Sequence, residues 1–160
     1  MSEPLVTYLH DHLAGSVHAI ETLKMMRDRH KNVPLGEFAR ELLNEIEQDR
    51  ETLKHLAEKV GGGSATVKET AAWMAERASR LKLTHEAGDS LGSFEALEFV
   101  EIGIYGKWAL WSALDVAAPA DSRLQGFDFK HLAGRAEQQR LAVHKRRLEV
   151  ASRALMREAA

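Results

Sequence analysis

Apolar residues recur three and four positions apart along four long segments of this 160-residue chain, and proline and glycine separate several of these segments. Such spacing places apolar side chains on one face of an α-helix. The pattern predicts long helices at 4–30, 34–60, 91–117 and 129–155. Signals for strands are nearly absent, so the expected fold class is all-α.

Local signals mark where the predicted helices begin and end. Pro4 suits a first helical turn, and Asp128 can cap the last helix. The three glycines at 61–63 end the second helix. Thr66 and Glu69 form a capping box that opens a further, shorter helix.

The connections between these helices predict the topology. Short links join the first helix to the second and the last two helices to each other, so each pair is expected to form an antiparallel hairpin. The stretch of about 61–90 is then a long crossover that contains the short helix. Two hairpins joined in this way give the ferritin-like arrangement of a four-helix bundle. We expect a single domain over residues 1–160.

Composition excludes several classes of site. The chain has no cysteine, which rules out disulfides, thiolate metal sites and cysteine nucleophiles. The glycine run lacks the Gly-Lys-Ser/Thr of a phosphate loop, and no serine lies in a Gly-x-Ser-x-Gly elbow. No apolar run approaches the roughly 20 residues that span a bilayer, and the start of the chain does not have the order of a secretory signal. We therefore expect a cytoplasmic protein without a membrane segment.

Charge is unevenly distributed along the chain. Residues 86–128 are acidic and residues 129–160 are basic, with three consecutive basic residues at 145–147. Opposite charges within one small domain are expected to pair with each other, and no aromatic residues alternate with the basic ones to stack on bases. We expect no nucleic-acid partner.

Two matching quartets interrupt the apolar stripes of the second and last long helices near their middles. Residues 47–50 read Glu-Gln-Asp-Arg and residues 137–140 read Glu-Gln-Gln-Arg. Duplicated hairpins would bring such quartets to the same depth in a bundle. The alternative is a solvated face, because Glu, Gln and Arg are all good helix formers.

The first helix, from Tyr8-Leu9 through Leu13 to Ala19-Ile20, resembles the opening helix of bacterioferritin and related ferritin-like proteins, and the predicted layout resembles theirs along almost the whole chain. In that superfamily a Glu on each of two bundle helices and a Glu-x-x-His on each of the other two hold two iron or manganese ions. The resemblance implies that the corresponding positions here are Ser16, Glu47, Arg50, Glu98 or Glu101, Glu137 and Arg140.

The arginines change the chemistry that the resemblance implies. A guanidinium cannot ligate a metal, but it can hold carboxylates by forked hydrogen bonds where a cation would otherwise lie. We therefore expect a degenerate site without a metal or other cofactor. Its ion network would comprise Ser16, Glu47, Arg50, Glu98, Glu101, Glu137 and Arg140.

A noncanonical metal site is the alternative, since the chain has eight histidines. Glu51 and His55 lie four residues apart on one helical face, a spacing that allows chelation. Iron or manganese would then bind among His12, Glu51, His55, Glu101, Glu137 and His144.

Three functions follow from these alternatives. The first is a structural or interaction module without a catalytic metal. The second is a metal-dependent oxidoreductase or iron-handling protein with a noncanonical two-metal site. The third is a helical regulator that binds nucleic acid or a small ligand between its helices.

The helix predicted at 91–117 is apolar on two faces, and this predicts assembly. We expect the bundle interior to take the face formed by Phe94, Leu97, Glu98, Glu101, Tyr105 and Trp108. The opposite face is formed by Phe99, Ile102, Gly103, Gly106, Leu110 and Ala113. Soluble monomers rarely expose a large apolar patch, so we expect a homodimer in which the two glycines let another backbone approach closely.

Overall fold

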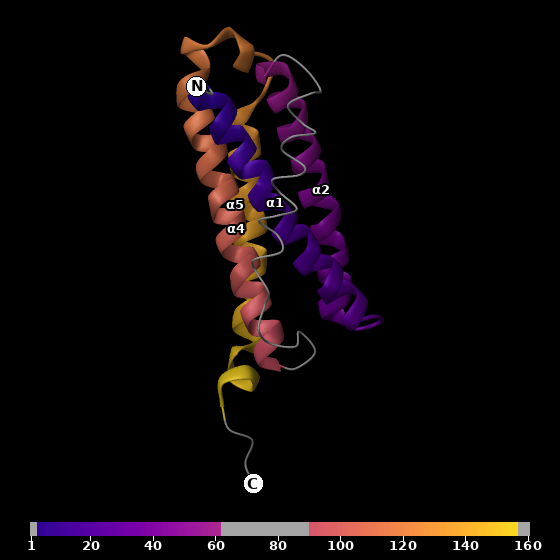
Figure 1. The fold of residues 1–160 in the computed structure, drawn as a ribbon. Coiled ribbons are helices and arrows are strands. Elements are labelled where there is room, and N and C mark those ends of the chain that lie inside the picture. The colour runs from indigo at the N-terminus through magenta and orange to yellow at the C-terminus, as the bar shows by residue number, and fades with distance from the viewer. Residues whose placement is uncertain (1–2, 62–89, 157–160) are drawn as a thin grey trace.

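The computed structural model describes residues 3–61 and 90–156, which form four long helices in two hairpins (Figure 1). The helices are α1 (Pro4–Arg29), α2 (Pro34–Gly61), α4 (Ser90–Ala117) and α5 (Phe129–Leu155). Two short 3₁₀ helices, η1 (Ala118–Ala120) and η2 (Ser122–Leu124), connect α4 to α5. The described residues contain no strand, so the all-α prediction is confirmed.

Local chemistry accounts for the helix ends. Asp128 caps α5 as predicted, because its Oδ1 accepts a hydrogen bond from the His131 backbone N–H at 2.9 Å. The turn between α1 and α2 is tight and includes Asn32 at a positive φ of 62°. A Cβ on Gly36 would lie 1.9 Å from the His30 carbonyl oxygen, so only glycine fits there.

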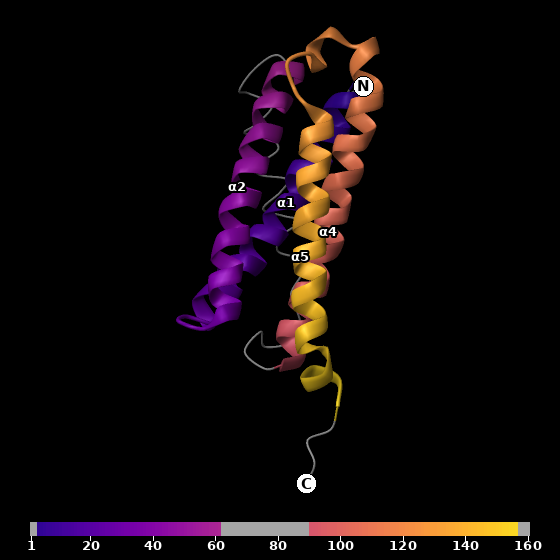
Figure 2. The ribbon, with the colours of Figure 1, turned by 180° about the vertical axis from the view of Figure 1, so that it is seen from behind.

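The two hairpins run antiparallel within themselves, whereas α2 and α4 run in the same direction (Figures 1 and 2). Gly61 ends α2 at one end of the bundle, and Ser90 begins α4 at the opposite end. The Ser90 hydroxyl there donates to the Arg153 carbonyl at the end of α5, at 3.4 Å. The short helix predicted between 61 and 90 lies outside the described residues.

The core lies between the hairpins and is centred on α4. Five of its inward side chains recur three, four or seven positions apart and are almost fully buried, and these are Leu97, Val100, Ile104, Trp111 and Leu114. Trp111 stacks on Phe129 of α5 with ring centroids 6.2 Å apart. Burial of each such side chain stabilises the fold by roughly 1.5–3 kcal/mol. None of the described helices combines the length and apolarity needed to cross a membrane.

The prediction of which face of α4 points inward was partly wrong. Tyr105 and Glu98 were expected inside, yet Tyr105 is 56% exposed and Glu98 is also exposed. Leu110 was expected on the outer face but is 1% exposed. The reason is that α4 packs against α1 as well as α5. A Cβ on Gly103 would lie 3.9 Å from the Ala19 Cβ of α1, so this glycine faces a helix of the same chain.

Candidate functional site

A buried polar cluster lies in the middle of the bundle, where α2, α4 and α5 face one another. Lys107 Nζ donates to Asp49 Oδ2 and to Gln139 Oε1, each at 2.5 Å. Gln139 Nε2 donates in turn to Asp49 Oδ2 at 3.1 Å. Asp49 and Gln139 are 3% and 4% exposed. The three side chains therefore satisfy one another's polar atoms inside an apolar core.

Two further charged residues extend this cluster toward the surface. Arg135 Nε lies 3.4 Å from Asp49 Oδ1, and Gln139 Nε2 also donates to Glu45 Oε2 at 2.9 Å. The formal charges of Glu45, Asp49, Lys107 and Arg135 sum to zero. Burial lowers the pKa of the Lys107 ammonium, and the neighbouring Asp49 carboxylate opposes that shift. The cluster is thus balanced in charge by protein groups.

Asp49 and Gln139 are the third residues of the two quartets found in the sequence. Their contact places the quartets at the same depth, but the inward side chains are not the Glu and Arg residues on which sequence reasoning concentrated. The missed signal was periodicity: Asp49, Lys107 and Gln139 each take an apolar position in their helix. They belong to the series 46–49–53, 104–107–111 and 136–139–143, whose members are all buried except the half-buried Lys107.

Four residues of the predicted ion network meet on the surface between α4 and α5. Arg140 pairs with Glu137 of its own helix at 2.8 Å and lies 3.5 Å from Glu101. Arg147, which was not predicted, pairs with Glu101 at 2.8 Å and with Glu98 at 3.0 Å. The Arg140 guanidinium lowers the pKa of Glu137 by hydrogen bonding. This group is a partly exposed ion network and not a core site.

The other three residues of the predicted network lie on the side of the bundle near α1. Arg50 Nε donates to Ser16 Oγ at 3.1 Å, and the Ser16 hydroxyl donates to the Leu13 carbonyl at 2.6 Å. Glu47 is exposed and borders a hollow between α1 and α2. The structure therefore does not join the seven predicted residues into one network. Arg50 turns toward α1, whereas Arg140 turns toward α4.

The residues of the alternative metal site are also spread out. Glu101 Oε1 and His144 Nδ1 are 2.9 Å apart. Glu51 is exposed and lies 3.8 Å from Lys54, while His55 contacts the Phe127 ring. Glu137 pairs with Arg140, and His12 lies in the pocket described next. In the described parts of the chain, no three His, Asp or Glu side chains are placed to hold one ion.

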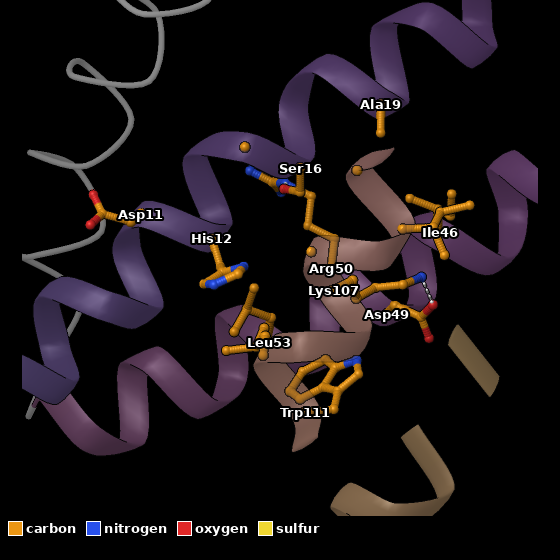
Figure 3. Close-up of a pocket in the computed structure, with 15 residues that line it drawn as sticks. Asp11, His12, Ser16, Ala19, Ile46, Asp49, Arg50, Leu53, Lys107 and Trp111 are labelled. Atoms are coloured by element: carbon orange, nitrogen blue, oxygen red, sulfur yellow. Dashed lines mark hydrogen bonds and ion pairs between the residues drawn. The ribbon is translucent and has the colours of Figure 1, made fainter. Parts of the chain in front are cut away.

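A pocket of about 370 Å³ lies between α1, α2 and α4, next to the buried cluster (Figure 3). Its walls are mostly apolar and include Leu53 and Trp111. Polar side chains reach it from all three helices, among them His12, Arg50 and Lys107. Burial lowers the pKa of His12, which favours its neutral form.

Comparisons with known proteins do not assign a role to this site. No protein-family model matches the chain, and neither a curated protein nor a solved structure was found to be similar to it. Function is therefore inferred from the geometry and chemistry of the site itself.

Proposed function

We propose that this protein is an interaction module of ferritin-like layout that works by binding and not by metal chemistry. The observation that supports the proposal is the position of the Lys107 ammonium. It lies in the middle of the bundle interior, bonded to Asp49 and Gln139, where ferritin-like proteins hold their cations between carboxylates.

The ammonium makes this interior unsuitable for a divalent ion. A protonated lysine has donors only and offers no lone pair to a metal. The ammonium also forms an ion pair with Asp49, the one buried carboxylate among the described residues, and it would repel a second cation beside it. Metal binding needs deprotonated ligands in sufficient number, and the interior offers a carboxylate already neutralised by Lys107.

Elemental analysis of protein purified without chelator tests this proposal. We expect less than about half an equivalent of iron, manganese or zinc per chain, because ligands and negative charge are lacking. Lys107→Glu is a useful comparison, since it replaces the ammonium with a second carboxylate beside Asp49. After incubation with manganese and dialysis, this variant should retain more metal than the parent. Two ions per chain in the parent would refute the proposal.

We further propose that one binding partner is a second copy of this chain. The supporting feature is an exposed apolar stripe on α4 that includes Ile102, Tyr105 and Val116, which are 66%, 56% and 82% exposed. At 100° per residue these positions, with Ala109 and Ala113, fall within an arc of about 80°. A twofold contact between such stripes would bury apolar surface that a monomer leaves in water.

A further inference from the structure

The pocket between α1, α2 and α4 is large enough for a small organic molecule. Its volume is about 370 Å³, within the range of ligand sites. At about 30 Å³ per non-hydrogen atom, as in liquid water, it would hold roughly a dozen such atoms. Buried Ile104, Leu110 and Trp111 form its inner wall, which suits an apolar body.

Two mid-helix glycines keep this pocket open. Gly15 of α1 and Gly106 of α4 both line it, and a Cβ built on either would meet no atom of the described residues within 4 Å. Packing therefore does not require glycine at these positions. Alanine there would favour the helix by roughly 0.5–1 kcal/mol at each site. The missing side chains leave the space for a ligand at a cost in helix stability.

Arg50 supplies a cation with free donors at this pocket. Ser16 Oγ accepts a hydrogen bond from its Nε and so fixes the guanidinium, and neither terminal nitrogen has a partner among the residues that the structure describes. No carboxylate of the described residues lies within 4.0 Å of it. Lys107, by contrast, is already bonded to Asp49 and Gln139. The Asp11 carboxylate points away from the other labelled residues in Figure 3.

Trp111 supplies a second unused donor. Its side chain is fully buried, and its Nε1–H finds no acceptor among the residues that the structure describes. The nitrogen lies on the ring edge turned toward Lys107 in Figure 3. An unsatisfied buried donor is costly, so an acceptor oxygen supplied by a ligand would relieve a defect already present in the protein.

We propose that the pocket binds a linear monocarboxylate of about ten carbons, with the carboxylate on Arg50 and an oxygen of the tail near Trp111. A guanidinium whose two terminal nitrogens are free can bind a carboxylate through a forked pair of hydrogen bonds. The tail lies against the apolar inner wall. Lys107 and Asp49 also line this pocket, but the proposed ligand contacts are with Arg50 and Trp111. Metal content tests the metal-free proposal and ligand titration tests this one, so the failure of either can be told from the failure of the other.

Calorimetric titration of the full chain with 10-hydroxydecanoate, decanoate and decanol tests the ligand class. Both acids should bind roughly ten- to a hundredfold more tightly than decanol, because a hydrogen bond to a charged group is stronger than one to a neutral hydroxyl. The hydroxy acid should bind more tightly than decanoate through Trp111. Equal affinity for decanol and the acids would overturn the anchoring role of Arg50, and absence of binding by all three would overturn the site.

Variants then locate the binding. Arg50→Met keeps an unbranched apolar stem but removes the guanidinium, so decanoate affinity should fall roughly tenfold or more while decanol affinity stays the same. Arg40→Met is the matched control, since Arg40 is exposed on the same helix and pairs with Glu37. Gly106→Leu should fill the pocket and abolish binding of all three compounds, with helicity and melting temperature confirming the fold. Unchanged decanoate binding by Arg50→Met and Gly106→Leu would place the ligand elsewhere.

Discussion

Gln139 of α5 donates a hydrogen bond from Nε2 to Oδ2 of Asp49 on α2, at 3.1 Å in the bundle core. Each residue is the third of its quartet, so both hairpins present the same quartet position to the same point in the core. Lys107 of α4 bonds to both side chains there. Three polar side chains, drawn from both hairpins, therefore bond to one another in the core of the bundle.

Loss of the Asp49 charge should destabilise the protein strongly. Asp49→Asn keeps the side-chain shape but leaves the Lys107 ammonium, whose side chain is 16% exposed, without a carboxylate beside it. Breaking a buried ion pair in this way costs about 3–5 kcal/mol of the free energy of unfolding, measured by urea denaturation. Glu47→Gln, at an exposed position of the same helix, should cost less than about 0.5 kcal/mol. Similar losses in the two variants would contradict a structural role for the pair.

A double variant separates what the ion pair contributes to the free energy of unfolding from the penalty of burying one charge without its partner. In Asp49→Leu with Lys107→Leu both buried charges are removed, and apolar side chains replace them. The double variant should be more stable than either single Leu variant, because in each single variant the remaining charge loses its closest counter-ion. Additive losses in urea denaturation would show that the two charges act independently.

The loop between α4 and α5 should make the stability of the fold depend on pH in the acid range. Hydrogen bonds from the side chain and backbone N–H of Arg123 lower the pKa of Asp121 from 3.8 to about 2. A lowered carboxyl pKa stabilises the fold above the unfolded value, and that stability is lost as pH falls from about 4 to about 2. Asp121→Asn should therefore have a lower melting temperature than the parent at neutral pH. Its melting temperature should also fall less than that of the parent as the pH is lowered through this window. Parallel melting curves for the two proteins would contradict this assignment.

The ion network on the α4–α5 surface should make a smaller contribution. Glu101 is 14% exposed and accepts from Arg147, with His144 and Arg140 close by. Glu101→Gln removes the shared anion of these groups and should lower the free energy of unfolding by about 1–3 kcal/mol. Glu149→Gln, which breaks an exposed pair with Arg146, should have an effect below about 1 kcal/mol.

The helices were predictable because their apolar spacing and end signals agree. Pro4 and Asp128 mark the starts of α1 and α5 that the structure reproduces, and local chemistry alone determines them. The inward face of α4 was not predictable in the same way. This helix is apolar nearly all round, so the contrast between faces that normally gives the orientation is absent.

The candidate site was predictable only in its depth along the bundle. The two quartets meet as their sequence match suggests, but through their third residues and not through the glutamates and arginines at their ends, which the ferritin-like resemblance implies. A polar residue at an apolar position of the stripe was the stronger signal, and Asp49 and Gln139 both carry it. Their partner Lys107 lies on another helix, and only the tertiary packing shows the pairing.

The exposed stripe of α4 should control assembly. Light scattering at micromolar concentration is expected to give twice the chain mass of 17.9 kDa, because pairing of two stripes removes Ile102 and its apolar neighbours from water. Ile102→Glu places a charge in that contact and should reduce the mass to one chain. Val33→Glu is the control, since Val33 is 44% exposed in the α1–α2 turn and far from the stripe in sequence. This variant should remain a dimer, whereas a parent with the mass of one chain would rule out the proposed contact.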